Sequence, residues 1–337
     1  MNTQMVQYAL LSMFLFLGLS LYIRLARKYH IIDKPNERSS HSITTVRGGG
    51  IIFVLAILIF AIKQGFDIPY FLLGFFAIST ISFLDDIKEK SKRSRLGIQL
   101  IAVVLLITQI TQGQIEWWQW GLFLFMAMSS INFYNFMDGI NGITAFYSLV
   151  LLGTLFYLYR IGQLVVAEEL IVMPIISVII FSFFNARKKA RCFAGDVGSV
   201  SLAFIVVFLV GLLCWQQQSL IYIWLFGVYG VDTVLTIIQR ILMGQNILKG
   251  HRLHLYQFMA NEGRLPHIFV STIYATLQAL LNVFLLVYVI PAEFNLVWVN
   301  ISMALFLIFI YVPVKYVFMR RKESMITEHS KAQSLAA

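Results

Sequence analysis

The sequence carries little charge for its length. Only 12% of the 337 residues are Asp, Glu, Lys or Arg, compared with about 25% in a typical soluble domain. By contrast, 59% of the residues are apolar and 15% are aromatic. Because so few charges cannot cover a folded chain of this size in water, the composition excludes an ordinary soluble globule. It predicts a protein that lies mainly in a lipid bilayer.

Cysteine and N-terminal charge are also scarce. The two cysteines, Cys192 and Cys214, are too few for a disulfide framework. The first 23 residues contain no charged side chain, and the basic residues Arg24, Arg27 and Lys28 follow this apolar stretch. A cleavable signal peptide has its basic residues before the apolar stretch. We therefore expect a retained first transmembrane helix with its N-terminus outside.

Long apolar stretches are abundant, at lengths of about 17–25 residues that span a bilayer as a helix. They predict an all-α polytopic membrane protein with about eleven transmembrane helices. We expect a single transmembrane domain over residues 1–319, followed by a polar cytoplasmic tail over residues 320–337. The stretches are near residues 5–26, 48–66, 68–84, 96–113, 118–136, 139–160, 167–185, 198–215, 219–239, 267–290 and 295–318.

Positive charge is distributed unevenly between alternate loops. If the loop at residues 24–47 is inside, 24 of the 26 Lys and Arg residues fall on the inner side, leaving Lys63 and Arg160 outside. Inner loops of membrane proteins carry such an excess, so the C-terminus is predicted to be cytoplasmic. The net charge of +10 then indicates contact with anionic lipids. It does not indicate nucleic-acid binding, for which no recognised module is visible.

The loop after the third apolar stretch begins with the acidic pair Asp85-Asp86 and continues with bases that include Lys88 and Arg95. Adjacent carboxylates repel each other and gain from a divalent cation. The bases could hold the phosphates that such a cation accompanies. The alternative is a solvated loop whose bases only set the topology.

A second polar motif contains Asn135, Asp138 and Asn141, with Gly139 and Gly142 beside them. Asn135 and Asp138 are three residues apart and share one face of a helix. Polar groups at a membrane boundary are costly unless they have partners, and glycine lets the backbone approach a ligand or turn tightly. The alternative is a helix cap followed by a tight turn.

The third motif, Gly195-Asp196-Val-Gly198-Ser199, opens an apolar stretch. Free amides at a helix N-terminus attract phosphate, and Asp196 could ligate a metal ion bound to that phosphate. The alternative is that Asp196 or Ser199 only caps the helix.

The longest inner loop contains His251, Arg252 and His254. This set suits an anionic substrate better than a structural zinc ion, which would usually also have Cys or carboxylate ligands. The alternative is a charged segment lying on lipid headgroups.

The first inner loop contains Arg38, His41 and Arg47, followed by the glycine run 48–50. The basic side chains could engage a lipid phosphate. The glycines permit either close helix packing or the approach of a phosphate.

These motifs together suit phosphoryl transfer, in which positioning and charge neutralisation do most of the work. In order and spacing they resemble those of the polyprenyl-phosphate N-acetylhexosamine-1-phosphate transferases, the glycosyltransferase 4 and phospho-MurNAc-pentapeptide transferase superfamily. The likeness covers residues 30 to 265. The run from Pro35 to His41 and the His-Arg-x-His form of residues 251–254 are most similar to the O-antigen-initiating subgroup.

The resemblance implies transfer of a sugar-1-phosphate from a UDP-linked N-acetylated sugar to undecaprenyl phosphate, with release of UMP. It implies Mg²⁺, or alternatively Mn²⁺, as cofactor, held by Asp196 and Asp138. The location would be the bacterial inner membrane, with the active site in residues 1–319 facing the cytoplasm, at the first membrane step of O-antigen lipopolysaccharide or other cell-envelope synthesis. By analogy with the peptidoglycan member, a homodimer is expected. The implied catalytic residues are Asp85, Asp86 and Asp196, and the implied substrate-binding residues are Asn135, Asp138, Asn141, Phe193, His251, Arg252, His254, Arg47, Lys88 and Arg95.

One position departs from the family pattern. The family often has Asp-Gly-Ile-Asp-Gly, whereas this chain has Asn141 at the second acidic position. If that carboxylate is essential, the protein would be weakly active or an inactive scaffold that binds polyprenyl phosphate. A membrane transporter or lipid flippase is the other alternative, although transporters usually place polar groups inside their spans.

Overall fold

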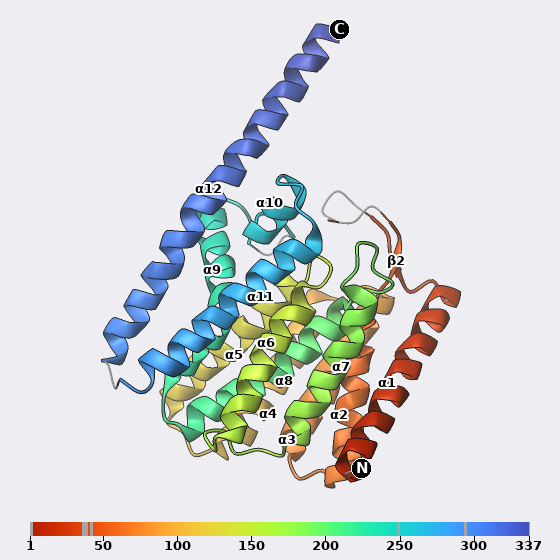
Figure 1. Ribbon diagram of the computed structural model, residues 1–337, viewed down its shortest axis with the longest axis vertical. Helices are drawn as coiled ribbons and strands as arrows, with labels where there is room; N and C mark the ends of the chain where they lie inside the picture. Colours follow the sequence, from red (N-terminus) through yellow and green to blue (C-terminus); the bar gives the residue numbers. More distant parts are fainter. Residues whose placement is uncertain (1–2, 36–39, 41–42, 248–249, 293–294, 337) are drawn as a thin grey trace.

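The computed structural model describes residues 3–35, 40, 43–247, 250–292 and 295–336 (Figure 1). In this part of the chain the only strands are β1 (Ile32–Asp33) and β2 (Thr45–Val46), which pair antiparallel. All other regular structure is helical, which confirms the all-α prediction. The helices are α1 (Thr3–Lys28), α2 (Ile51–Gln64), α3 (Pro69–Ile87), α4 (Lys92–Thr111), α5 (Trp117–Met137), α6 (Ile143–Arg160), α7 (Glu169–Asn185), α8 (Gly195–Gln216), η1 (Leu220–Phe226), α9 (Gly227–Leu242), α10 (Leu255–Asn261), α11 (His267–Phe284), η2 (Leu285–Val289) and α12 (Leu296–Ala336).

Every predicted apolar stretch contains a helix in the described chain, but not every one of these helices has the length and hydropathy of a candidate membrane span. In the described chain, 8 helices are long and apolar enough to cross a membrane. Helices α2 and α7 are apolar but shorter. Helix α5 is not among the eight, and its sequence is interrupted by Gln119, Asn132 and Asn135.

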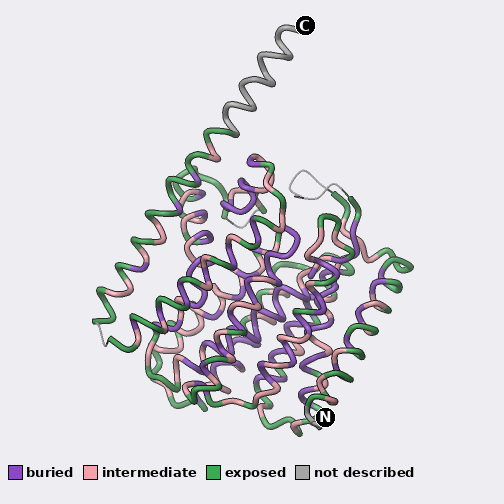
Figure 2. The backbone as a smooth tube through the Cα atoms, viewed as in Figure 1, coloured by how far each residue is buried: buried purple, intermediate pink, exposed green. Residues whose placement is uncertain are grey.

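Helix α8 is the centre of the bundle. In its most apolar window 83% of the residues are buried, and it contacts α2, α3, α4, α5 and α6. A helix that is apolar all round is stable only when other elements surround it or lipid replaces water. Helix α12 is the opposite case, with 11% of its window buried, and it lies along one side of the bundle (Figures 1 and 2).

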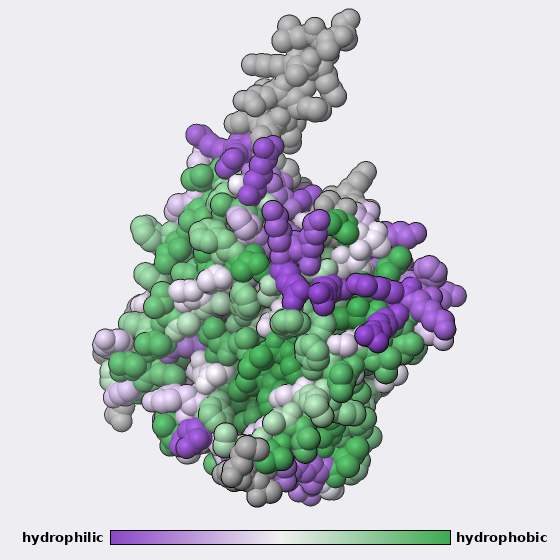
Figure 3. Space-filling view, turned by 45° about the vertical axis from the view of Figure 1, so that its right-hand side comes forward, coloured by the Kyte–Doolittle hydropathy of each residue, from purple (hydrophilic) through white to green (hydrophobic). Residues whose placement is uncertain are grey.

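The polar loops gather at one end of the bundle. The β1–β2 pair and α10 lie at the end from which α12 projects, whereas the N-terminus lies at the other end (Figure 1). Hydrophilic side chains concentrate at this same end, above a wide apolar belt (Figure 3). Helix α12 runs past residue 319 to Ala336 without a break. The membrane-spanning elements therefore carry their polar motifs to a single end.

Candidate functional site

The N-terminal ends of α2 and α8 lie against each other. The amide groups of Gly49 and Gly50 donate to the carbonyl oxygens of Phe193 and Ala194, at 2.8 and 2.9 Å. A Cβ on Gly50 would overlap the Cα of Gly198. The glycine run therefore provides close packing, which was one of its two predicted roles.

Asp86 caps the N-terminus of α8. Its Oδ1 accepts a hydrogen bond from the amide of Asp196, and its Oδ2 accepts one from the amide of Val197, both at 2.9 Å. Gly195 adopts a φ of 73°, and a Cβ there would collide with the Asp86 carboxylate. Because a helix N-terminus favours a negative charge, Asp86 stabilises the element that presents Asp196.

Two arginines join three acidic residues from two separate helices. Arg47 Nε lies 2.6 Å from Asp86 Oδ1, and Arg47 Nη2 lies 3.1 Å from Asp196 Oδ1. Arg95 similarly bridges Asp85 Oδ2 and Asp196 Oδ2, at 2.6 and 3.2 Å. Burial lowers the pKa of Arg47, but the carboxylates of Asp86 and Asp196 outweigh this effect and raise it. The structure thus brings Asp85, Asp86 and Asp196 into one ionic network.

A polar cavity of about 300 Å³ opens beside this network. Asp138 lies at its wall and accepts a hydrogen bond of 2.6 Å from the Thr144 hydroxyl. Burial raises the pKa of Asp138 to about 6, and the charge of Asp196 adds to the rise. Asp138 and Asp196 therefore share one cavity, in which burial and their mutual repulsion disfavour the charged form of Asp138. Among the residues that line it are Arg47, Asn135, Asp138, Asn141, Phe193 and Asp196.

The Asp138–Gly142 turn is braced against the loop after α7. The Asn141 side-chain amide donates to the carbonyl of Arg187 at 2.7 Å. The amide of Gly142, whose φ is 86°, donates to Asn185 Oδ1 at 2.7 Å. An ionised Asp at position 141 would place a carboxylate oxygen against the Arg187 carbonyl oxygen, and two acceptors cannot form a hydrogen bond. Asn141 is therefore chemically matched to its surroundings.

Other predicted residues lie outside the cavity wall. Lys88 is exposed beyond α3, and His251, Arg252 and His254 do not line the cavity, although Gln257 of the same segment does. Burial, then the charges of His254, Arg240 and Lys315, lower the pKa of His251 to about 3, so it is neutral at pH 7. Arg38 and His41 lie outside the described residues.

Sequence reasoning missed several polar residues. Asn185, Gln257 and His267 line the cavity. Asn185 and His267 stand alone in the sequence, whereas Gln257 follows His254 by three residues. Asp232 is buried in α9 and bonds to His254. A carboxylate inside an apolar stretch is costly and usually functional, and this signal could have identified Asp232.

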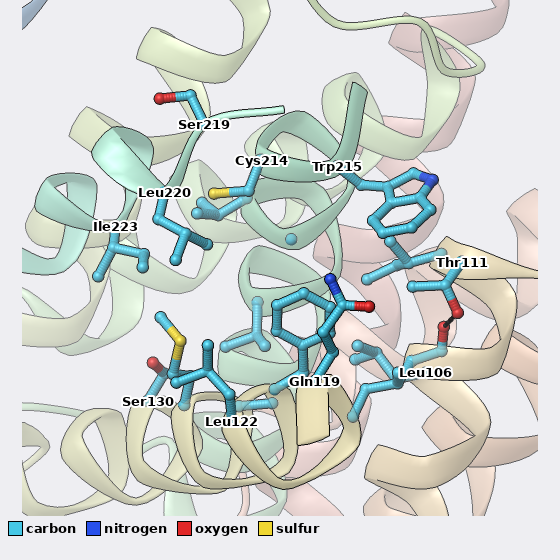
Figure 4. Close-up of a pocket in the computed structure, with 18 of the residues that line it drawn as sticks. Leu106, Thr111, Gln119, Leu122, Ser130, Cys214, Trp215, Ser219, Leu220 and Ile223 are labelled. Carbon is cyan, nitrogen blue, oxygen red and sulfur yellow. Dashed lines mark hydrogen bonds between the residues drawn. The ribbon is translucent and has the colours of Figure 1, made fainter. Parts of the chain in front are cut away.

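A second cavity, of about 250 Å³, is apolar and lies between α4, α5, α8 and η1 (Figure 4). Leu106, Leu122 and Leu220 approach it from three of these elements (Figure 4). It occupies the part of the bundle that includes Trp118 and Trp215, at the ends of α5 and α8 remote from Asp138 and Asp196. This space suits a hydrocarbon chain.

The fold and this site define a polytopic membrane protein with an acid–arginine centre at one end of its bundle. Residues 68–213 match the family model described as Glycosyl transferase family 4. This match covers less than half of the chain and agrees with the resemblance seen in the motifs.

Bacterial relatives match over a larger part of the chain. The probable undecaprenyl-phosphate N-acetylglucosaminyl 1-phosphate transferase of Bacillus subtilis is 26% identical over 271 residues, which cover 74% of this chain and 75% of the relative. The phospho-N-acetylmuramoyl-pentapeptide-transferase of Bacillus cytotoxicus is 28% identical, covering 66% and 77%. The undecaprenyl-phosphate alpha-N-acetylglucosaminyl 1-phosphate transferase of Yersinia pestis is 25% identical, covering 78% of each.

Proposed function

We propose that this protein transfers an N-acetylhexosamine-1-phosphate from a UDP-sugar to undecaprenyl phosphate and releases UMP. The observation that carries the proposal is the shared cavity of Asp138 and Asp196, with Arg47 at its wall. This cavity lies beside the N-terminus of α8, where Arg47 offers a positive charge that can bind a phosphate group. The reactions named for the relatives support the same chemistry.

In the proposed reaction, an oxygen of undecaprenyl phosphate attacks the sugar-bearing phosphorus of the donor. The bond from that phosphorus to the bridging oxygen breaks, and UMP leaves with the bonding electrons. A phosphate monoester has a second pKa of about 6 and is mostly ionised at pH 7, so no strong base is needed. This favours direct in-line attack over a covalent aspartyl intermediate. The protein's task is then to position and neutralise the phosphates.

The residues of the cavity fit a magnesium ion. Among the described residues no group of three or more His, Cys, Asp or Glu side chains could hold a metal, but Mg²⁺ usually takes one or two carboxylates plus substrate phosphates. Asp138 and Asp196 supply those two carboxylates, and a bound cation would offset both the burial and the charge of Asp196, which raise the pKa of Asp138. When bound, Mg²⁺ (or Mn²⁺) would neutralise charge on the donor diphosphate.

The remaining residues divide between the two substrates. Asn135, Asn141 and Phe193 line the cavity and would orient the donor. Arg95 lies between Asp85 and Asp196 and is partly exposed, so it would meet the acceptor phosphate, with Lys88 nearby in sequence. The apolar cavity of Figure 4 would hold part of the isoprenoid chain.

In the cell this reaction would be the first membrane step of O-antigen or another cell-envelope polysaccharide. The excess of basic residues in alternate loops supports an active site on the cytoplasmic face of a bacterial inner membrane. Candidate donors are UDP-GlcNAc, UDP-GalNAc and their 6-deoxy relatives that carry FucNAc or QuiNAc.

The test is UMP release by purified protein with Mg²⁺, undecaprenyl phosphate and each candidate donor. Asp196→Ala should lower release by about two to three orders of magnitude, as expected for loss of a preorganised electrostatic group, and EDTA should abolish it. Asp67→Ala, which changes an exposed acid outside the cavity, should leave release unchanged. Release without lipid, absence of release with every donor, or full activity of Asp196→Ala would refute the proposal.

A further inference from the structure

Arg47 and Arg95 each hold two carboxylates, at clearly different distances. Arg47 Nε lies 2.6 Å from Asp86 Oδ1, whereas its Nη2 lies 3.1 Å from Asp196 Oδ1. Arg95 Nη1 likewise lies 2.6 Å from Asp85 Oδ2, whereas its Nη2 lies 3.2 Å from Asp196 Oδ2. Each arginine therefore has one short ion pair with an acid of α3 and one longer ion pair with Asp196.

The acids of the two short ion pairs are fixed by the backbone. Asp86 accepts hydrogen bonds from two amides at the start of α8, and Asp85 accepts one from the Lys90 amide. The side chain of Asp86 is 0% exposed and that of Asp85 is 5% exposed. Neither carboxylate can reach a ligand without leaving these backbone donors. The two acids therefore serve as anchors for the arginines.

Asp196 has a different environment. Its side chain is 17% exposed and lines the polar cavity. Both of its carboxylate oxygens face an arginine, since Oδ1 pairs with Arg47 and Oδ2 pairs with Arg95. Two guanidinium groups repel a divalent cation and compete with it for the same oxygens. A cation therefore binds Asp196 most favourably when at least one of the longer ion pairs opens.

A diphosphate supplies what both sides of such an exchange need. Its oxygens accept charge-assisted hydrogen bonds from guanidinium groups, frequently as bidentate pairs. Phosphate oxygens are also the usual ligands of Mg²⁺ beside one or two carboxylates. Arg47 lines the cavity, and the side chains of Arg47 and Arg95 are both partly exposed. The short ion pairs keep the arginines within reach of the cavity while the longer ones change partner.

We propose that Arg47 and Arg95 form a clasp on Asp196 that opens when the donor diphosphate binds. The arginines then turn their Nη2 atoms from Asp196 to phosphate oxygens, and the Asp196 carboxylate becomes available to the cation. Asp85 and Asp86 hold the arginines in place throughout. Cation and donor consequently bind weakly alone and tightly together. The identity of the donor rests on the proposed function, whereas the clasp is measurable without any turnover.

The experiment measures Mn²⁺ binding by electron paramagnetic resonance, in which bound Mn²⁺ loses the signal of the free ion. The full chain in detergent is titrated with and without each candidate UDP-sugar, and undecaprenyl phosphate is left out so that no transfer occurs. Arg95→Lys keeps the positive charge but replaces the planar fork, which spans two carboxylates, by a single ammonium group. Arg93→Lys is the matched control, because Arg93 is exposed on the same turn of α4.

We expect a donor to tighten Mn²⁺ binding by the unmodified protein about 5- to 150-fold, the usual range for coupling between two ligands. In Arg95→Lys, Mn²⁺ alone should bind about tenfold more tightly, since one hydrogen bond between charged groups no longer opposes it, and a donor should add less. A variant that only damages the site would bind Mn²⁺ more weakly. Arg93→Lys should match the unmodified protein, and thermal unfolding checks that each variant is folded.

Equal or weaker Mn²⁺ binding by Arg95→Lys would overturn the proposal, as would tight binding by the unmodified protein that no donor improves. If Arg95→Lys does not fold, Arg47→Lys is judged by the same criterion. Absence of Mn²⁺ binding under every condition would refute the metal in the proposed function and the clasp with it. Absence of UMP release alongside donor-coupled Mn²⁺ binding would refute the transfer reaction and leave the clasp standing.

Discussion

Neighbouring residues of the acidic pair have different tasks. Asp86 accepts hydrogen bonds from two backbone amides at the start of α8, so its negative charge stabilises this helix N-terminus. Asp85 instead accepts the Lys90 amide at 2.6 Å and pairs with Arg95. Neither lines the polar cavity, whereas Asp138 and Asp196 do. At the scale of single residues, hydrogen-bond partners therefore separate the acids that support the ends of helices from those that line the cavity.

Asn141→Asp tests whether the missing family carboxylate matters. The new carboxylate would lie against the Arg187 carbonyl that now accepts the Asn141 amide. We expect a loss of about 1–3 kcal/mol in the free energy of unfolding, the cost of an unsatisfied buried acceptor, and no gain in UMP release. Denaturation in detergent and the release assay measure the two effects.

Asn135→Asp provides the comparison for this variant, because Asn135 also lines the cavity but makes no contact with Arg187. Faster release by Asn141→Asp at unchanged stability would show that the family's second acid has a chemical role that this chain has lost.

At the scale of elements, the site depends on how closely α2 and α8 approach. Gly50 has a φ of −69°, which any residue adopts, so its need for glycine is purely steric. Gly198 provides the matching surface on α8. The ends of these two helices set the positions of Arg47 and Asp196, whose side chains form an ion pair.

Gly50→Ala should separate the two helix ends. The overpacked contact should lower stability by about 1–3 kcal/mol and reduce UMP release as well, because Arg47 and Asp196 move apart. Gly97→Ala is the matched control, since a Cβ on Gly97 in α4 meets nothing within 4 Å. Thermal unfolding and release should be nearly unchanged in that control, and equal losses in both variants would contradict the packing argument.

Helix α5 connects the two cavities, because Ala127 faces the apolar one and Asn135 the polar one. Ala127→Trp should fill space needed by the isoprenoid chain. We expect it to raise KM for undecaprenyl phosphate about tenfold or more, since each excluded methylene weakens binding by about 0.8 kcal/mol. KM for the UDP-sugar should not change.

The comparison for Ala127→Trp is Ala77→Trp, in a separate apolar groove between α3 and α4. If Ala77→Trp impairs the long acceptor and Ala127→Trp does not, the chain lies in that groove instead. A short-chain polyprenyl phosphate should restore turnover in the variant whose cavity is blocked.

On the scale of the whole molecule, charge separates the two ends of the bundle. Lys188 is exposed in the loop before α8, near the polar cavity, and Gln114 is exposed in the connection between α4 and α5. These two loops lie at opposite ends of the helix bundle. The distribution of basic residues predicts that the Lys188 end faces the cytoplasm.

Single cysteines test this orientation in a background with Cys192→Ser and Cys214→Ser. Gln114→Cys should react with a membrane-impermeant maleimide in intact cells with a permeabilised outer envelope, whereas Lys188→Cys should react only after lysis. The reverse pattern would place the site on the outer face and contradict a cytoplasmic UDP-sugar donor.

The sequence by itself determined that this protein lies mainly in lipid, that its architecture is all-helical and that its polar motifs fall in alternate loops. Apolar length and loop charge decide these features locally, since each helix must satisfy its own backbone in lipid. The number of membrane crossings stays a prediction, because in the described chain α2 and α7 are apolar but short and α5, which carries polar residues, is not among the eight candidate spans.

Only the tertiary structure decided which polar residues act together. Asp86 accepts a hydrogen bond from the amide of Asp196, 110 positions away in the sequence. Asn141 donates to the Arg187 carbonyl, and Asp232 of α9 contacts the His254 ring. Hydrogen bonds and ion pairs of this kind depend on distances of a few ångströms between elements that pack independently of their order in the chain. Spacing along the sequence identifies such residues as chemically capable, and packing determines their partners.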